Sequence, residues 1–160
     1  MSELETLLES LRGQRRHVLG ILEGLGEEEL RRPVLPSGWS CLGMVRHLTI
    51  DDERFWFRGV IGGDTSELEI AADNWKVGPE VPAAEILALY RRECELADAV
   101  IGSSALDAAP TWWPDDLFGQ WRLHNVREVL LHMVAETACH AGHLDAAREL
   151  IDGRQWMRQG

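Results

Sequence analysis

The residues best suited to chemistry lie on one predicted helix near the end of the chain. His132, Glu136, His140 and His143 follow one another at three- and four-residue steps. An α-helix advances by ~100° per residue, so these four side chains project within an arc of about 80°. Glu136 and His140 are four residues apart, which places them one turn apart on one face, where both can bind one metal ion. The helix therefore predicts two ligands of a metal site.

A third ligand must come from elsewhere, because a catalytic zinc site usually has three protein ligands and one position open for water or substrate. His47 is the candidate, since it lies between apolar positions on another predicted helix, an unusual setting for a solvated histidine. Asp51, one turn later, could orient this imidazole or act as a base, and His143 could exchange a proton near neutral pH. Two simpler interpretations remain: His47 as a hydrogen-bonded structural residue, and Glu136 with His143 as part of a solvated polar face.

The seven tryptophans, against one tyrosine, are a second unusual feature. Tryptophan side chains are by default anchors of the core or of packed loops. Four of them nevertheless lie in irregular segments beside the predicted starts of two helices, where they could line a substrate pocket. These four are Trp39, Trp112, Trp113 and Trp121.

The cysteines predict no disulfide and no cysteine nucleophile. Cys41, Cys94 and Cys139 are odd in number and far apart, and no C-x-x-C pair occurs. Cys41 and Cys94 occupy helical positions suited to small buried residues. Cys139 adjoins His140 in the sequence but points ~100° away from it on a helix, so a Cys–His pair is not expected. A thiol nucleophile would have to come from a second substrate.

Four helices are expected to position these side chains. Apolar residues recur at helical steps over residues 3–25, 40–60, 83–101 and 125–152. Asn125 and Glu128 predict a capping box at the start of the last helix, and Gly153 a left-handed cap at its end. Glycines and prolines interrupt segment 61–82, which is long enough to return along a helix as a crossover. With no convincing strand pattern, residues 1–160 are predicted to form a single all-α domain, a four-helix bundle.

Composition and charge narrow the possible partners. Acidic residues outnumber basic ones 27 to 16, giving a net charge of -11, whereas a protein that neutralises phosphates needs a basic surface. Nucleic acid is therefore not an expected partner. No stretch approaches the ~18 uncharged apolar residues of a membrane span, and the N-terminus lacks the basic and apolar regions of a secretion signal. We expect a cytoplasmic protein that acts on a small molecule.

Two segments resemble the DinB-like superfamily. Residues 36–48 (PSGWSCLGMVRHL) and residues 129–153 (VLLHMVAETACHAGHLDAARELIDG) carry the resemblance, which extends over nearly the whole chain and is closest to an actinobacterial branch. The resemblance implies a four-helix bundle in up-down-down-up order, often dimeric, with a long crossover between the second and third helices. It also implies a divalent metal site of three residues, in many members three histidines.

The resemblance assigns particular residues to that site. His47 and His140 match two of the histidines, and Glu136 stands where the remaining one often is. The resulting His, Glu, His set is similar to that of mycothiol-dependent maleylpyruvate isomerase. Zinc accepts a glutamate oxygen as a ligand, with nickel, manganese and iron as alternatives. Many relatives have glutamine where this chain has His143.

Characterised members of the superfamily include thiol S-transferases that use bacillithiol or mycothiol. The resemblance therefore implies a metal-dependent thiol S-transferase or isomerase that acts as a homodimer. A metal ion would activate a low-molecular-weight thiol, whose thiolate attacks an electrophile. Two alternatives remain open: a metal- or small-ligand-binding bundle without turnover, and a structural bundle whose histidines bind nothing.

Overall fold

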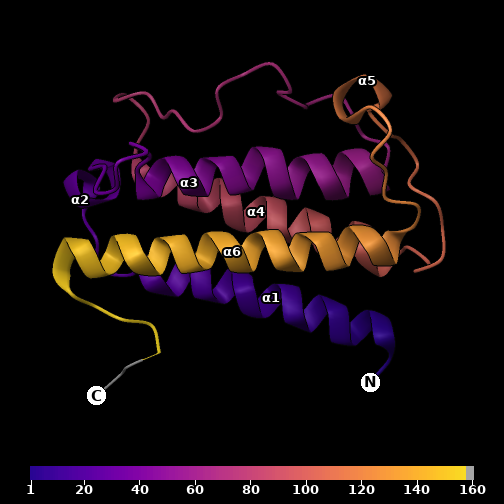
Figure 1. The fold of residues 1–160 in the computed structure, drawn as a ribbon, viewed down its shortest axis with the longest axis horizontal. Helices are drawn as coiled ribbons and strands as arrows, with labels where there is room; N and C mark the ends of the chain where they lie inside the picture. Colours follow the sequence, from indigo (N-terminus) through magenta and orange to yellow (C-terminus); the bar gives the residue numbers. More distant parts are fainter. Residues whose placement is uncertain (158–160) are drawn as a thin grey trace.

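The chain forms a bundle of long helices (Figure 1). The structure, a computed structural model, describes residues 1–157. The elements in chain order are α1 (Glu3–Leu22), α2 (Glu27–Arg31), α3 (Cys41–His47), η1 (Leu48–Ile61), α4 (Ala83–Gly102), α5 (Asp115–Phe118) and α6 (Val126–Asp152). The α3 and η1 segments are continuous and form one rod. The part of the chain that the structure describes contains no strand, as expected for an all-α fold.

The long helices follow the expected up-down-down-up order. Helices α1 and α6 run in one direction, while the α3–η1 rod and α4 both run in the other (Figure 1). Parallel neighbours cannot be joined by a short hairpin, so residues 62–82 return along the outside of the rod to the start of α4. This segment is the predicted crossover, and it contains turns but no helix.

Capping side chains account for the ends of the long helices. Ser2 and Glu5 form a capping box at the start of α1. Asn125 Oδ1 accepts a 2.9 Å hydrogen bond from the amide of Glu128, as predicted, although Glu128 Oε2 accepts from the amide of His124 and not from that of Asn125. Gly153 ends α6 with φ of 81°, in the left-handed region that glycine favours.

Two details differ from the sequence-based expectation. The first helix ends at Leu22 and not at residue 25, because Gly24 adopts φ of 86°, which breaks the helix. The short helices α2 and α5 were not predicted, since five and four residues are too few to show a hydrophobic period.

The rod changes its winding at the end of α3. From Leu48 onward, η1 is a π-helix, a winding defined by amides that bond carbonyls five residues earlier. The last such bond joins the amide of Gly62 to the carbonyl of Phe57 at 2.9 Å. The wider winding of a π-helix changes which side chains lie on the same face of the rod. It therefore decides which residues of η1 share a face with His47.

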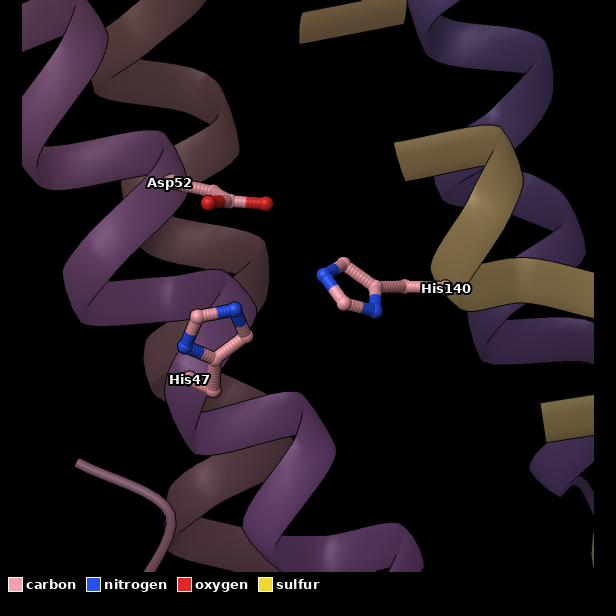
Figure 2. A group of neighbouring side chains, drawn as sticks. All are labelled: His47, Asp52 and His140. Carbon is pink, nitrogen blue, oxygen red and sulfur yellow. The ribbon is translucent and has the colours of Figure 1, made fainter. Parts of the chain in front are cut away.

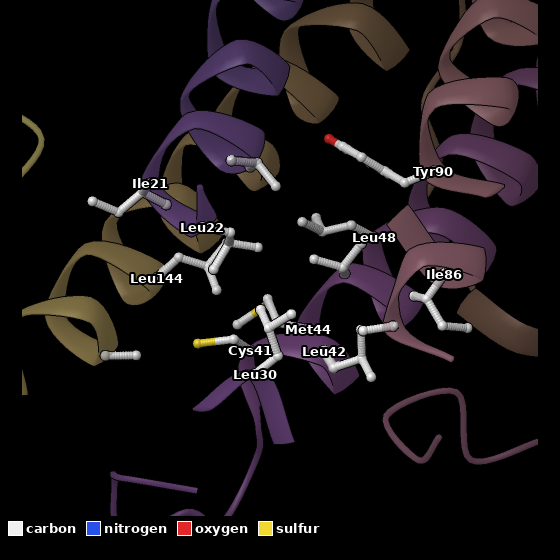
Figure 3. Close-up of a cluster of buried hydrophobic side chains, with 14 of the residues drawn as sticks. Ile21, Leu22, Leu30, Cys41, Leu42, Met44, Leu48, Ile86, Tyr90 and Leu144 are labelled. Atoms are coloured by element: carbon white, nitrogen blue, oxygen red, sulfur yellow. The ribbon is translucent and has the colours of Figure 1, made fainter. Parts of the chain in front are cut away.

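Two apolar clusters fill the bundle, and a polar layer separates them. One cluster, shown in Figure 3, is built around Ile21, Leu22, Met44, Leu48 and Leu144, and the other around Leu11, Phe57, Leu130 and Met133. The polar layer consists of the buried residues Arg15, Asp52, Glu53 and Thr137, which lie between the clusters along their helices. Arg15 donates two hydrogen bonds, of 2.7 and 2.6 Å, to the carboxylate of Glu53. None of the helices described is apolar over a length that could span a membrane.

Candidate metal centre

Three side chains from two sides of the bundle converge at the level of the polar layer. His47 at the end of α3, Asp52 on η1 and His140 on α6 each offer a ligand atom, and these atoms lie within 4.8 Å of one another. Figure 2 shows both imidazoles and the carboxylate directed into the space between the rod and α6. We call these three residues the metal cluster. Two nitrogens and one carboxylate oxygen form a donor set that suits zinc and related divalent ions.

Asp52 was not among the ligands that the sequence indicated, and the π-helix explains why. Five residues separate it from His47, which in an α-helix amounts to ~500° and would direct the two side chains to different faces. In a π-helix, residues five apart are close to one turn apart, so Asp52 returns to the face of His47. The signal in the sequence was the run of acids Asp51, Asp52 and Glu53 in the middle of a predicted helix.

The crossover holds His47 in place. Asp51 Oδ2 lies 2.7 Å from His47 Nδ1, and because a carboxylate only accepts, Nδ1 carries the hydrogen and Nε2 keeps its lone pair. Asn74 of the crossover, itself buried, donates to Asp51 Oδ1 at 2.7 Å. The indole of Trp75 stacks on the imidazole of His47, with ring centroids 4.1 Å apart. These contacts fix both the tautomer and the direction of the ring, as outer partners of metal-binding histidines do.

The other two members of the cluster carry unpaired polar atoms. Asp52 Oδ2 and His140 Nδ1 are buried and have no hydrogen-bond partner. Burial, reinforced by the neighbouring carboxylates of Glu53, Glu136 and Asp51, raises the pKa of Asp52 well above its usual value. Burial, with the imidazoles of His47 and His143, lowers the pKa of His140 to about 4. A buried carboxyl group beside two imidazoles fits a divalent cation, which would accept lone pairs from all three and favour the ionised form of Asp52.

The remaining candidates on α6 lie around the cluster at different distances. Glu136, expected as a ligand, is outside the group of three, and its Oε2 lies 3.9 Å from His140 Nε2. Its side chain is 45% exposed, so it can rotate. His143 is exposed, with its ring centroid 5.6 Å from that of His140. His132 instead packs against Trp56 and Trp121.

The four tryptophans expected around a pocket lie in different places. Trp39 lines a cavity of about 720 Å³ together with Trp75, which stacks on His47. Trp112 and Trp113 line a separate cavity of about 520 Å³ beside α5. Trp121 packs against an aromatic group on the same side of the bundle, formed by Trp56, Trp113 and Phe118.

The three cysteines are free thiols. Burial raises the pKa of Cys41 to about 11, and burial followed by the charge of Glu53 raises the pKa of Cys94 above its usual value. Both therefore remain protonated near neutral pH. Cys139 is exposed on α6.

The chain matches the family of mycothiol S-transferases over residues 6–153. Because the match spans most of the chain, the protein belongs to this family, and the resemblance to the DinB-like superfamily is confirmed. No curated protein and no solved structure matches it.

Proposed function

We propose that this member of the mycothiol S-transferase family is a divalent-metal-dependent thiol S-transferase that joins a low-molecular-weight thiol, in the first place mycothiol, to an electrophile. The observation that carries the proposal is the metal cluster: two imidazoles and a buried carboxylate without a partner converge in the polar layer. An apolar core would be more stable without such a carboxylate, unless a cation completes it.

The residues around the cluster have separate tasks. Asp51 and Trp75 hold the His47 ring so that its Nε2 faces the cluster. His140 stays neutral, as a metal ligand must, and Asp52 would supply negative charge once a bound cation displaces its proton. A bound divalent ion would lower the pKa of a thiol and so provide a thiolate at neutral pH.

Two side chains at the edge of the cluster complete the proposed site. Glu136, close to His140 and partly exposed, is proposed as an additional oxygen donor. His143 is proposed to accept the proton that the thiol releases, because its imidazole is exposed at the edge of the cluster, with its ring centroid 5.6 Å from that of His140. We assign Asp51 to positioning His47, since both its oxygens are already engaged by His47 and Asn74.

The cavity of about 720 Å³ is proposed as the place of the thiol cosubstrate. Trp39 and Trp75 contribute flat rings, and Ser37, Asp73 and Lys76 contribute polar groups that suit a hydroxyl-rich molecule. Because Cys41 is buried, Cys94 is half-buried and the pKa of each is raised, a cosubstrate is a better source of thiolate than these thiols of the protein.

Zinc is the proposed ion, with nickel, manganese and iron as alternatives. The alternative reaction at the same site is an isomerisation that proceeds through a thiol adduct. We also propose a cytoplasmic homodimer that does not bind nucleic acid, for which the net charge of -11 is unsuited.

Metal content and thiol conjugation, measured on the same sample, test the function. Untagged protein is analysed for metals, stripped with a chelator, reloaded with zinc, and assayed with mycothiol and a panel of electrophiles. We expect bound metal, loss of conjugation on stripping and recovery on reloading. Fully loaded protein that conjugates no thiol would contradict the transferase and support a metal-binding protein without turnover.

A further inference from the structure

We propose that the electrophile is an uncharged, electron-poor aromatic molecule that binds in an apolar cavity beside the metal cluster. This inference rests on the proposed function and names the class of its second substrate. The cavity has a volume of about 260 Å³ and is lined by His47, Asp51, Asp52, Phe55, Trp56, Ile70, Leu117 and Phe118.

The cavity opens onto the metal cluster itself. Two of the three members of the cluster, His47 and Asp52, line its wall. Asp52 is 5% exposed, and its Oδ2 has no hydrogen-bond partner. A molecule in this cavity would therefore lie beside the place where the proposed thiolate forms, which the reaction requires.

The lining of the cavity offers no basic side chain to an anionic electrophile. Besides His47, its charged or titratable lining consists of Asp51 and Asp52, and no lysine or arginine contributes. The adjoining cavity of about 520 Å³, which shares Ile70 and Leu117, also has no basic residue in its lining. Carboxylate or phosphate groups would therefore be desolvated in the cavity without a basic side chain as a partner, which disfavours their binding.

The rest of the lining selects for flat apolar molecules. Phe118 of α5 stacks on Trp56, with centroids 5.5 Å apart and planes inclined by 13°, and it meets Phe55 edge-on. The faces of these rings are electron-rich, so they complement an electron-poor ring better than a saturated or electron-rich one. The volume lies slightly below the ~300 Å³ at which typical ligand pockets begin, which suits a molecule of one or two rings.

The chemical step is a substitution on the aromatic ring. The thiolate sulfur forms a bond to the ring carbon that carries the leaving group. The bond from that carbon to chlorine breaks, and chloride leaves with the bonding electron pair. The thiol proton passes to His143, the proposed acceptor, and from there to solvent. No oxidant or reductant is needed, because chloride leaves with the bonding electron pair.

Two electrophiles of different charge test the cavity. Zinc-loaded protein is assayed with mycothiol and either chlorodinitrobenzene, which is uncharged, or chloronitrobenzoate, which is anionic, and each rate is divided by the uncatalysed rate. Leu117→Arg and Ile70→Arg introduce a positive charge at side chains that are each 50% exposed, so folding should persist. Leu150→Arg, at a residue 60% exposed on α6 outside the cavity lining, is the matched control.

We expect the wild type to prefer chlorodinitrobenzene. The ratio compared is kcat/KM for chlorodinitrobenzene divided by kcat/KM for chloronitrobenzoate. Leu117→Arg or Ile70→Arg should reduce this ratio by about tenfold, the lower end of the effect of one altered pocket contact. Leu150→Arg should leave the ratio unchanged. Equal use of both electrophiles by the wild type, or the same ratio in all three variants, would overturn the aromatic site while leaving the transferase intact.

A binding measurement tests the aromatic site independently of whether the protein conjugates a thiol. Dinitrotoluene does not react with thiols, and it quenches the fluorescence of tryptophans it contacts, such as Trp56. Saturable quenching that weakens in Leu117→Arg but not in Leu150→Arg supports the site even if no thiol is conjugated. Quenching that does not saturate, or that all variants share, overturns it.

Discussion

Asp51 Oδ2 accepts a 2.7 Å hydrogen bond from Nδ1–H of His47, and the other oxygen of Asp51 accepts a bond of the same length from the Asn74 side chain. A residue of the crossover thus positions an imidazole on the rod through a single carboxylate. The remaining nitrogen of His47 is directed at Asp52 and His140 (Figure 2).

Asp51→Asn should weaken metal binding without unfolding the bundle. The amide can still accept from His47 but no longer adds negative charge behind the imidazole, and loss of such a partner typically lowers metal affinity by about 10- to 100-fold. Competition with a chromophoric chelator measures the affinity. Asp145→Asn is the matched control, because Asp145 also lies 2.7 Å from a histidine, His17, outside the cluster. Equal affinities in the two variants would contradict this role of Asp51.

Asp52→Asn should stabilise the metal-free protein and weaken metal binding. Burial raises the pKa of the unpaired Asp52 carboxyl, so the metal-free chain must protonate this group to fold at neutral pH, and asparagine removes that cost of roughly 1–3 kcal/mol. With the ion present, the same substitution removes the carboxylate ligand. Urea unfolding of the stripped protein and chelator competition measure the two effects. Glu136→Gln, at a side chain 45% exposed, should leave metal-free stability unchanged and reduce affinity less. A larger loss of affinity in Glu136→Gln would make Glu136 the principal oxygen ligand.

Removing the ion should lower the melting temperature of the wild type. An ion that binds only the folded chain adds about 2.7 kcal/mol at a hundredfold excess over Kd, and in a protein of this size each kcal/mol corresponds to roughly 2–4 °C. Scanning calorimetry with and without chelator measures the shift. His140→Ala should abolish the response, whereas His124→Ala, at an exposed histidine, should retain it. If chelator still lowers the melting temperature of His140→Ala, the ion binds outside the metal cluster.

Alkylation should distinguish the three thiols. Iodoacetamide at pH 8 should modify Cys139 first, because Cys139 is exposed, while the pKa of about 11 keeps buried Cys41 protonated until the pH approaches that value. Mass spectrometry of the labelled peptides gives the order. Cys139→Ser should retain thiol conjugation, since the nucleophile comes from the cosubstrate. Loss of conjugation in that variant, with metal still bound, would point to a nucleophile in the protein.

Arg15→Met should destabilise the bundle strongly. The substitution leaves the Glu53 carboxylate, 1% exposed, without its two hydrogen bonds from the guanidinium. Breaking a buried ion pair in this way costs about 3–5 kcal/mol, which urea unfolding would detect. The double variant Arg15→Met/Glu53→Met should recover most of the loss, because it removes the buried carboxylate together with its partner. A double variant as unstable as the single one would show that packing, and not charge, is responsible.

The sequence by itself determined where the long helices lie and roughly where each begins and ends. The reason is that the hydrophobic period and the capping residues act within a few residues of one another. Asn125 and Gly153 mark the limits of α6 as predicted. His47 and His140 could be singled out because imidazoles on apolar helix positions are unusual, and the structure brings both into one cluster.

Only the tertiary structure decided which carboxylate faces His47 and His140. The π-winding of η1 moves Asp52 onto the face of His47, and arithmetic based on an α-helix cannot anticipate that change. The path of the crossover, which places Asn74 and Trp75 against Asp51 and His47, is equally invisible in the sequence. Such contacts join segments that share no local period, so only packing of the whole bundle brings them together.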